Sequence, residues 1–416
     1  MSNKVIIAAA GSGKTQYLVK EALKSSSGNV LITTFTDKNT EEIKSRIIAE
    51  ANYIPKNITV IPWFSFLLKH GVRPYQSMVY ADKRIDNLIL MNQQSALRTE
   101  ESDFCHHYLN NDGKIYSDKI SKLVCKIDKQ TNGLVISRLS QIYSSIFIDE
   151  VQDLAGYDLE FIKLLLYSPI NILLVGDHRQ GTFTTNNSSK NKQYRQERIN
   201  TYFSALHAVG IIEYDDTTLQ TNYRCVPEIC NFANSIFPEY SQCVSGNKTS
   251  VNHMGVYIVK DDDVDSYLDT FSPVQLRNNK TTAVSSKYPV INFGASKGQS
   301  FDRVLIYPTY SIIKWILKGA ELKPETRSKL YVAVTRARYS VAFVYTPKKK
   351  DVLNIPLYKK KNRLIYRSDL IAHRSLLILK ILTKISIRFF DDEDSIRIRQ
   401  KRRSFQLASG ALWQSI

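Results

Sequence analysis

The chain has 416 residues, of which 43% are hydrophobic and 23% are charged. This is the composition of a globular protein, which excludes a disordered or fibrous one, and its length suits two or three domains. The formal net charge of +18 indicates a polyanionic partner, with nucleic acid first and an anionic membrane surface second. No apolar run approaches the ~18 residues of a membrane span, so we expect no membrane partner.

The five cysteines are few, odd in number and unevenly spaced, which excludes a disulfide scaffold. Cys225 and Cys230 have no second pair of ligands nearby, so a structural metal site is not expected. This cysteine usage suits a reducing compartment, and a strand-like run at residues 4–8 leaves no room for a signal peptide. We therefore expect a location in the cytoplasm, at the nucleoid, or in a nucleus or virus factory for a eukaryotic or viral source.

In the first half of the chain, β-branched runs alternate with helical periodicity, which is typical of a parallel α/β sheet. The predicted strands are residues 4–8, 30–33, 58–61, 145–148 and 170–175, with helices from about 16, 40 and 157. Residues 66–140 interrupt this alternation and are predicted to be an insertion. The polar tract 182–193 is predicted to be a loop.

A second α/β unit follows residue 215, with strands predicted at 255–260, 290–293, 304–307 and 341–345. Residues 348–416 then hold 17 Lys/Arg against 6 Asp/Glu, so most of the net charge lies there. Within them, residues 374–388 have apolar periodicity that predicts a helix. We expect an α/β protein with domains at 1–214 and 215–346 and a basic C-terminal extension at 347–416.

A phosphate-binding loop is predicted between the first strand and the first helix. It consists of Ala8, Ala9, Ala10, Gly11, Ser12, Gly13, Lys14 and Thr15, with Gln16 next to it on the helix. Small residues let backbone N–H groups close around the phosphates of ATP, Lys14 reaches the β- and γ-phosphates, and Thr15 can hold Mg²⁺. The alternative is a glycine-rich turn without a ligand, which leaves the Lys-Thr pair unexplained.

Two carboxylates end the predicted strand at residues 145–148. Asp149 suits Mg²⁺ coordination, and Glu150 suits activation of an attacking water molecule. The alternative is a pair of acids that simply open a surface helix. Beside a phosphate-binding loop, we favour the metal and water site.

Seven motifs occur in one order, and that order resembles the UvrD/Rep/PcrA-type superfamily 1 DNA helicases. They are residues 11–15, 34–38, 149–153, 176–180, 222–224, 296–298 and 331–337, and the match runs from residue 4 to about 346. The resemblance implies two tandem RecA-like domains with parallel sheets, which bind ATP and Mg²⁺ between them.

The resemblance also implies roles for single residues in both α/β units. Gln180 resembles the γ-phosphate sensor, Tyr223 the aromatic that stacks on adenine, and Gly298 lies in a nucleotide-binding motif. Arg224 and Arg336 resemble the two arginines that reach the phosphates from the second domain, where guanidinium groups stabilise developing charge. A salt-bridge role is the alternative for each arginine.

Residues at the ends of two strands resemble the family's grip on single-stranded DNA. They are Thr34, Phe35 and Thr36 after the second strand, and Trp63 and Phe64 after the third. A hydroxyl can bond a phosphate and an aromatic ring can stack on a base. Core packing is the alternative for Trp63 and Phe64.

The resemblance leads us to expect an ATP-dependent helicase or translocase on single-stranded or tailed duplex DNA, with 3′→5′ polarity implied by the family. Only 65 residues separate Arg224 from Val290, too few for the large accessory insertion of typical members. In addition, only Gly181-Thr182-Phe183 follows Gln180 where the family has an aromatic-rich stretch. These departures support an alternative, a DNA-dependent ATPase switch or sensor that works with a protein partner. An RNA helicase is a weaker third possibility, and the basic extension is either a DNA contact or a solvated terminus.

Overall fold

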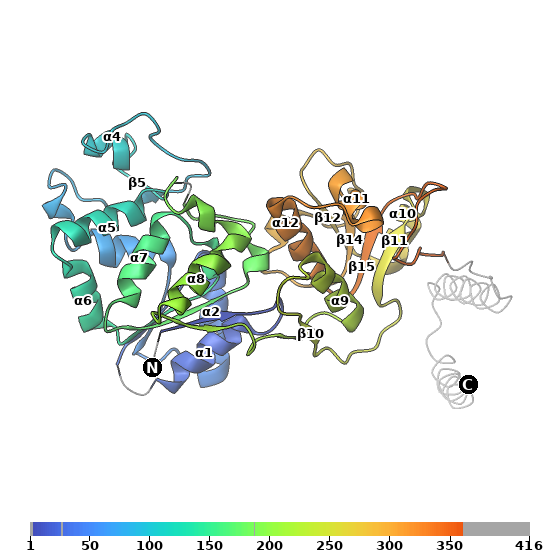
Figure 1. Ribbon diagram of the computed structural model, residues 1–416, viewed down its shortest axis with the longest axis horizontal. Helices are drawn as coiled ribbons and strands as arrows, with labels where there is room; N and C mark the ends of the chain where they lie inside the picture. Colours follow the sequence, from blue (N-terminus) through green and yellow to red (C-terminus); the bar gives the residue numbers. More distant parts are fainter. Residues whose placement is uncertain (1–2, 26–27, 187, 361–416) are drawn as a thin grey trace, which may run out of the picture. The chain divides into compact units, whose positions relative to one another are not determined.

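Two larger β-sheets, both parallel, organise residues 3–25, 28–186 and 188–360, which are the residues that the computed structural model describes. The chain divides into two units, Met1–Tyr358 and Lys359–Ile416. Both sheets lie in the first unit, and Figure 1 labels the main helices beside them. The predicted α/β class with two RecA-like domains is therefore confirmed. The basic residues 361–416, including the helix predicted at 374–388, lie outside the described residues.

Lobe 1, from β1 to β8, is built on a six-stranded sheet in the order β3-β2-β6-β7-β1-β8. Its strands are β1 (Lys4–Ile7), β2 (Val30–Thr34), β3 (Ile58–Pro62), β6 (Ser145–Ile148), β7 (Asn171–Gly176) and β8 (Glu213–Asp215). The main helices are α1 (Lys14–Lys24), α2 (Asp37–Ala51), α7 (Tyr157–Leu166) and α8 (Ile199–Ala208). All five strand pairings are parallel, which places the carboxyl ends of β1, β6 and β7 at one edge of the sheet.

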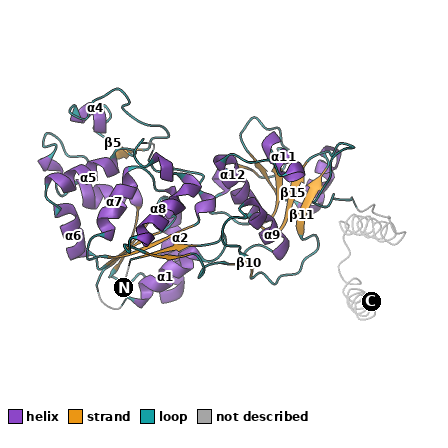
Figure 2. Ribbon diagram, viewed as in Figure 1, coloured by secondary structure: helices purple, strands orange, loops and turns teal. Residues whose placement is uncertain are grey.

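The central strands of lobe 1 are mostly apolar because helices cover both faces of the sheet, as Figure 2 shows. Every residue of β2 and β6 is buried. Leu31 and Ile146 face one core, whereas Ile32 and Phe147 face the other. Because successive side chains of a strand point to opposite faces of the sheet, each strand contributes to two separate cores.

The insertion predicted at 66–140 is present between β3 and β6 and is mainly helical. It contains a π-helical turn (Leu67–Val72), β4 (Leu88–Ile89), α4 (Phe104–Tyr108), β5 (Ile115–Tyr116), α5 (Ile120–Gln130) and α6 (Leu134–Ile142). Gly71 packs so closely on α5 that a Cβ there would lie 2.6 Å from a methyl group of Val124. The insertion is therefore part of the lobe 1 core.

Lobe 2, the described residues after β8 up to Tyr358, is built on a five-stranded sheet in the order β11-β15-β14-β12-β13. Its strands are β11 (Gly255–Val259), β12 (Val274–Arg277), β13 (Val290–Asn292), β14 (Phe301–Tyr307) and β15 (Ala337–Val344). Its helices are α9 (Pro227–Ile236), α10 (Val264–Phe271), α11 (Tyr310–Lys318) and α12 (Pro324–Val334). A short parallel pair, β9 (Thr221–Asn222) and β10 (Val244–Ser245), lies between the two sheets in sequence.

The sequence analysis missed β12, a four-residue strand that contains two polar side chains. Gln275 is fully buried there, and its amide group donates to the Ser285 carbonyl (2.8 Å) and accepts from the hydroxyl of Tyr307 (2.8 Å). A buried glutamine is tolerated because both ends of its amide have partners. Those partners come from distant residues, so no local pattern reveals this strand.

Residues 347–358, which we predicted to begin the basic extension, pack against lobe 2. The Tyr358 N–H donates to the Ile258 carbonyl (2.7 Å), and the Ile258 N–H donates to the Pro356 carbonyl (2.9 Å). Ile355 is buried in the lobe 2 core. These residues therefore continue the sheet beyond β11. Among all described residues, no helix has both the length and the apolar character that a membrane crossing requires.

Trp63 lies in the core of lobe 1, which corrects the prediction that it contacts DNA. Its side chain is 1% exposed and packs against Phe66 and Phe161, with ring centroids 5.7 and 6.1 Å away. Its indole N–H donates to a carboxylate oxygen of Asp158 at 2.9 Å. Ser121 and Thr185 also donate to this carboxyl group, so a buried polar group ties the residue after β3, α5 and the polar loop to α7.

We predict that Trp63→Phe lowers the free energy of unfolding by about 1–3 kcal/mol, because the buried Asp158 carboxylate loses one donor. Single-stranded DNA affinity should stay unchanged. Urea unfolding and oligonucleotide binding check the two statements. Trp315→Phe is the control, because its indole N–H donates to no group within the described residues. A loss of DNA affinity without a loss of stability would contradict the core assignment.

Candidate nucleotide-binding cleft

A cleft of about 440 Å³ opens where the carboxyl edge of the lobe 1 sheet meets lobe 2. Lobe 1 contributes the loop from Gly11, the start of α1 and the two acids after β6. Lobe 2 contributes Tyr223, Gly298 and a set of arginines, which are Arg224, Arg336 and Arg338. The structure thus brings together residues that lie more than 300 positions apart in the sequence, as the motif order led us to expect.

The loop before α1 has the backbone of an anion cradle. Gly11 and Gly13 have left-handed φ values of 70° and 84°, which only glycine adopts readily. A Cβ on Gly11 would lie 2.6 Å from the Asn222 amide oxygen, so this glycine also permits a close approach. No side chain caps α1, which leaves its first N–H groups open to the cleft.

Lys14 adds a full positive charge to the cradle. Its side chain is buried at the first position of α1, and within the described residues no carboxylate lies within salt-bridge distance of it. A buried ammonium group without a direct ion-pair partner is costly. The geometry therefore suits the binding of a phosphate group beside Lys14.

Ala8, Ala9 and Ala10 lie behind the cleft, which corrects their prediction as nucleotide-binding residues. The N–H of Ala8 donates to the Gly176 carbonyl and that of Ala9 to the Leu219 carbonyl, both at 2.8 Å. The N–H of Ala10 approaches the Tyr331 hydroxyl at 3.4 Å. These groups hold the loop against the sheet and α12, whereas residues 11–16 line the cleft.

Thr15 and Asp149 fit a magnesium ion. The Thr15 hydroxyl lies 3.2 Å from a carboxylate oxygen of Asp149, and both side chains line the cleft. Burial and the neighbouring Glu150 carboxylate raise the pKa of Asp149 to about 7. Oxygen ligands of this kind are those that Mg²⁺ prefers, and phosphate oxygens usually complete its shell. No group of three His, Cys, Asp or Glu side chains suited to a metal is found in the described residues, so this site would depend on the phosphate oxygens.

Glu150 has a left-handed backbone, with φ at 56°, directly after β6. This conformation is costly for a residue with a Cβ and turns the chain sharply at the tip of the strand. Although burial acts to raise it, the ammonium groups of Lys297 and Lys14 hold the pKa of Glu150 at about 2. The carboxylate is therefore ionised at neutral pH.

Lys297 of lobe 2 reaches into the acidic cluster of lobe 1. Its ammonium nitrogen lies 2.7 Å from the Asp153 carboxylate and 3.3 Å from that of Glu150. All three side chains are largely buried. Burial raises the pKa of Asp153 to about 6 even though Lys297 opposes the shift. The sequence analysis quoted Lys297 within a motif but assigned it no role.

Arg336 and Gln180, predicted separately, are hydrogen-bonded to each other across the lobes. The Arg336 guanidinium donates to the Gln180 amide oxygen at 3.0 Å, and the Gln180 amide nitrogen donates to Asp177 at 2.9 Å. Arg336 is 1% exposed and also donates to the carbonyl of Val332 at the end of α12. Burial, together with the like charge of Arg224, lowers the pKa of Arg336. An anion beside it would relieve this electrostatic cost.

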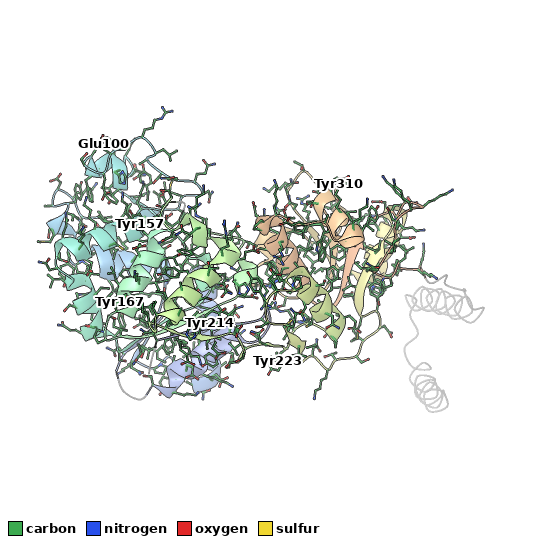
Figure 3. The ribbon with its side chains drawn as sticks, in the orientation of Figure 1. Glu100, Tyr157, Tyr167, Tyr214, Tyr223 and Tyr310 are labelled. Atoms are coloured by element: carbon green, nitrogen blue, oxygen red, sulfur yellow. The ribbon has the colours of Figure 1, made fainter. Side chains whose placement is uncertain are left out.

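Arg224 and Tyr223 also line the cleft from lobe 2. The Arg224 guanidinium donates to the carbonyl of Thr335, which places it next to Arg336 in space. Tyr223 is 67% exposed, and Figure 3 labels it. An exposed tyrosine ring at the mouth of a cleft is able to stack on a flat base.

The five residues predicted to grip DNA differ in accessibility. Thr34 is buried, and Thr36 is exposed but accepts a hydrogen bond from the Asn39 N–H (3.1 Å) as the N-cap of α2. Phe35 is half-buried and packs edge-to-face on Phe64, with ring centroids 5.7 Å apart. Phe64 is itself 6% exposed. Of the five, only Phe35 and Thr36 are therefore accessible to a strand.

The sequence analysis missed several polar residues of the cleft. Arg46 and Glu42 of α2 line it and form an ion pair at 2.7 Å, and Gln16 accepts a hydrogen bond from Arg46 at 3.2 Å. Asn247 and Arg338 line the side of lobe 2. None of these residues lies in a recognisable motif, and only the fold brings them to the cleft.

Comparison with known proteins supports the helicase resemblance of the motifs. A family model described as an AAA domain matches residues 1–185. The chain is 22% identical to the probable DNA helicase II homolog of Mycoplasma genitalium over an alignment of 293 residues, which covers 56% of this chain and 40% of that protein. The chain thus spans less than half the length of this relative. The match to this relative supports the resemblance to UvrD-type helicases, and residues 1–185 are similar to an AAA domain.

Solved structures of the Arterivirus nonstructural protein 10 (helicase) are also similar. One matches with a TM-score of 0.43 and 14% identity, covering 84% of this chain and 60% of that chain. A complex of the same protein with DNA matches with a TM-score of 0.43 and 15% identity, covering 83% and 61%.

We predict that Lys297→Met lowers the free energy of unfolding by about 3 kcal/mol at pH 8, because it leaves two buried carboxylates without their cation. Without Lys297, the folded-state pKa values of Glu150 and Asp153 rise above their unfolded values. The variant then loses stability as the pH rises through the raised folded-state pKa values. Its deficit in the free energy of unfolding relative to the wild type should therefore be clearly smaller at pH 5 than at pH 8.

Urea unfolding at the two pH values, with a chelator present, measures this difference. Lys329→Met is the matched control, since Lys329 pairs with Glu325 one helical turn away on the surface. An equal deficit for Lys297→Met at pH 5 and pH 8 would contradict the ion-pair assignment.

Proposed function

We propose that this chain is an ATP-dependent helicase or translocase on single-stranded DNA, with ATP bound in the cleft between lobe 1 and lobe 2. The observation that carries the proposal is the hydrogen bond between Arg336 of lobe 2 and Gln180 of lobe 1, beside the phosphate-binding loop. Hydrolysis that needs a guanidinium from the other lobe depends on how the lobes meet. That dependence is what converts hydrolysis into movement along a strand.

In this proposal, the residues of lobe 1 bind the phosphates and position the water. The N–H groups at the start of α1 and the ammonium group of Lys14 hold the β- and γ-phosphates. Thr15 and Asp149 hold Mg²⁺, which neutralises phosphate charge when it is bound. Glu150 is ionised and orients the attacking water, although Lys297 makes it a weak base in the nucleotide-free protein.

The residues of lobe 2 complete the site. Arg336 and Arg224 stabilise the charge that develops on the transferred phosphoryl group. Tyr223 stacks on the base and Gly298 approaches the nucleotide from the same side. We place the two nucleotide-binding domains at residues 1–214 and 215–346, with residues 347–358 packed on the second and a basic extension after them. Of the residues predicted to grip DNA, Phe35 and Thr36 are the ones we retain as strand contacts. The 3′→5′ polarity rests on the resemblance alone.

A second candidate is a DNA-dependent ATPase switch or sensor that works with a protein partner without processive unwinding. The observation in its favour is the length of lobe 2 between Arg224 and Val290, where the helices are α9, a short 3₁₀ turn and α10. The chain thus has no room there for the large accessory insertion of the helicases it resembles.

ATP hydrolysis by the full chain, measured with and without single-stranded DNA and then with 3′- and 5′-tailed duplexes, tests the proposal. We expect DNA to stimulate hydrolysis and a 3′-tailed duplex to be unwound. Stimulated hydrolysis without strand separation would favour the switch. Stimulation by RNA but not by DNA would overturn the choice of substrate.

We predict that Glu150→Gln lowers DNA-stimulated turnover by about 10²–10⁴-fold while ATP and DNA binding persist, because positioning survives and water activation does not. Lys14→Ala should instead weaken nucleotide binding itself. Fluorescent-nucleotide binding and steady-state hydrolysis separate the two effects. Glu325→Gln, at an exposed position of α12, is the control, and near wild-type turnover of Glu150→Gln would refute the assignment.

A further inference from the structure

A second cleft, of about 200 Å³, lies between the insertion of lobe 1 and the polar loop 182–193. It shares no lining residue with the nucleotide cleft. Figure 3 labels Tyr157 of this cleft, which projects apart from Tyr223 of the nucleotide cleft. The walls include Lys119 and Lys122 of the insertion and the hydroxyl residues Ser188 and Ser189 of the loop.

A neutral histidine sits between the two lysines. The Nδ1 atom of His107 lies 2.8 Å from the Thr99 carbonyl, which only accepts hydrogen bonds, so Nδ1 carries the proton. The Nε2 lone pair therefore faces the ammonium groups of Lys122, at 3.2 Å, and Lys119, at 3.5 Å. Burial and these two ammonium groups lower the pKa of His107, so the ring offers them a lone pair but no negative charge.

Lys119 is a buried cation without a direct ion-pair partner. Its side chain is 7% exposed, and no carboxylate in the described residues lies within salt-bridge distance of its nitrogen. The adjacent Asp118 is occupied, because it accepts hydrogen bonds from the backbone N–H and the hydroxyl of Ser95 at 2.9 and 2.7 Å. Buried lysines are normally paired, so this one indicates a missing anion.

The other charged groups around the cleft do not balance its positive charge. Glu101 is shared between two lysines, with its oxygens 2.6 Å from the nitrogen of Lys122 and 3.3 Å from that of Lys126. Three ammonium groups thus face Glu101 and the occupied Asp118. The guanidinium of Arg195 donates to the Ser188 carbonyl and fixes the loop wall beside them. The cleft keeps an excess of positive charge together with hydroxyl donors.

We propose that this cleft binds a phosphate group, supplied by the sugar–phosphate backbone of a nucleic-acid strand. Its volume suits a phosphate group and is smaller than the pockets that hold whole small-molecule ligands. Two ammonium groups and two serine hydroxyls are the donors that backbone phosphates use. Leu97, which is 74% exposed, lies on the rim, where a sugar or a base of the same strand would contact it. The choice of a strand rests on the proposed function.

The loop wall also connects this cleft with the catalytic acids. The loop follows Gln180 directly, and the Thr185 N–H donates to the Asp153 carbonyl at 2.9 Å. Asp153 is in turn the partner of Lys297. A strand bound against Ser188 and Ser189 would thus contact the loop that follows Gln180, the proposed phosphate sensor. Through Thr185 the same loop is hydrogen-bonded to Asp153, whose carboxylate pairs with Lys297 of lobe 2.

The test measures binding of a fluorescein-labelled oligothymidylate to the nucleotide-free full chain by anisotropy at several salt concentrations. We expect Lys119→Met and Lys122→Met each to weaken binding about tenfold, as for a lost hydrogen bond to a charged group. The slope of log affinity against log salt should flatten by roughly 0.7, the value for one single-strand phosphate. Lys129→Met, in the last turn of the same helix and exposed, is the control of equal charge.

Lys122 is only half-buried, so Lys122→Met alone tests the proposed phosphate site if Lys119→Met fails to fold. Affinities and slopes equal to those of Lys129→Met would overturn the proposal. A second arm measures the thermal shift caused by inorganic phosphate against chloride at equal ionic strength. Stabilisation by phosphate that Lys122→Met abolishes, with unchanged oligonucleotide binding, would make the ligand a free anion and overturn the strand assignment. If the wild type binds no oligonucleotide, the proposed function fails along with the strand, and the phosphate arm alone decides whether the cleft is an anion site.

Discussion

The arrangement of the cleft depends on the ion pairs made by the ammonium group of Lys297. It lies on lobe 2, yet it contacts the Asp153 and Glu150 carboxylates of lobe 1. Carboxylates buried at a sheet edge need a cation or a proton, and here the cation comes from the other lobe. The electrostatic state of Glu150, and with it the proposed activation of water, therefore depends on the contact between the lobes.

Positively charged groups of the cleft, like its carboxylates, are held where their charge is costly. Arg336 and Arg224 lie close together with lowered pKa values, and Lys14 is buried with no carboxylate partner among the described residues. These cations converge on the open N–H groups of α1. The protein thus assembles an electrostatic environment for a polyphosphate before one is bound, at a cost in folding stability that a bound nucleotide would offset.

The two proposed anion sites follow one physical rule, that a buried cation without a counterion indicates a ligand. Lys14 in the nucleotide cleft and Lys119 in the insertion cleft are both of this kind. The first lies in a motif that the sequence alone identifies. The second lies in no motif, because other residues that line its cleft, such as His107 and Ser188, come from segments distant in the sequence. Local pattern found one site, and only geometry found the other.

The sequence by itself determined the parallel α/β class, the loop at residues 11–15 and the acids Asp149 and Glu150, because each depends on neighbours in the chain. A strand, a tight turn and a helix start are local, and so is a carboxylate at a strand end. Tertiary structure decided that Trp63 is core, that Ala8 to Ala10 lie behind the cleft, and that β12 exists. It also decided the roles of Lys297 and Lys119. Burial and charge balance depend on what the rest of the fold places around a side chain, and these neighbours are distant in sequence.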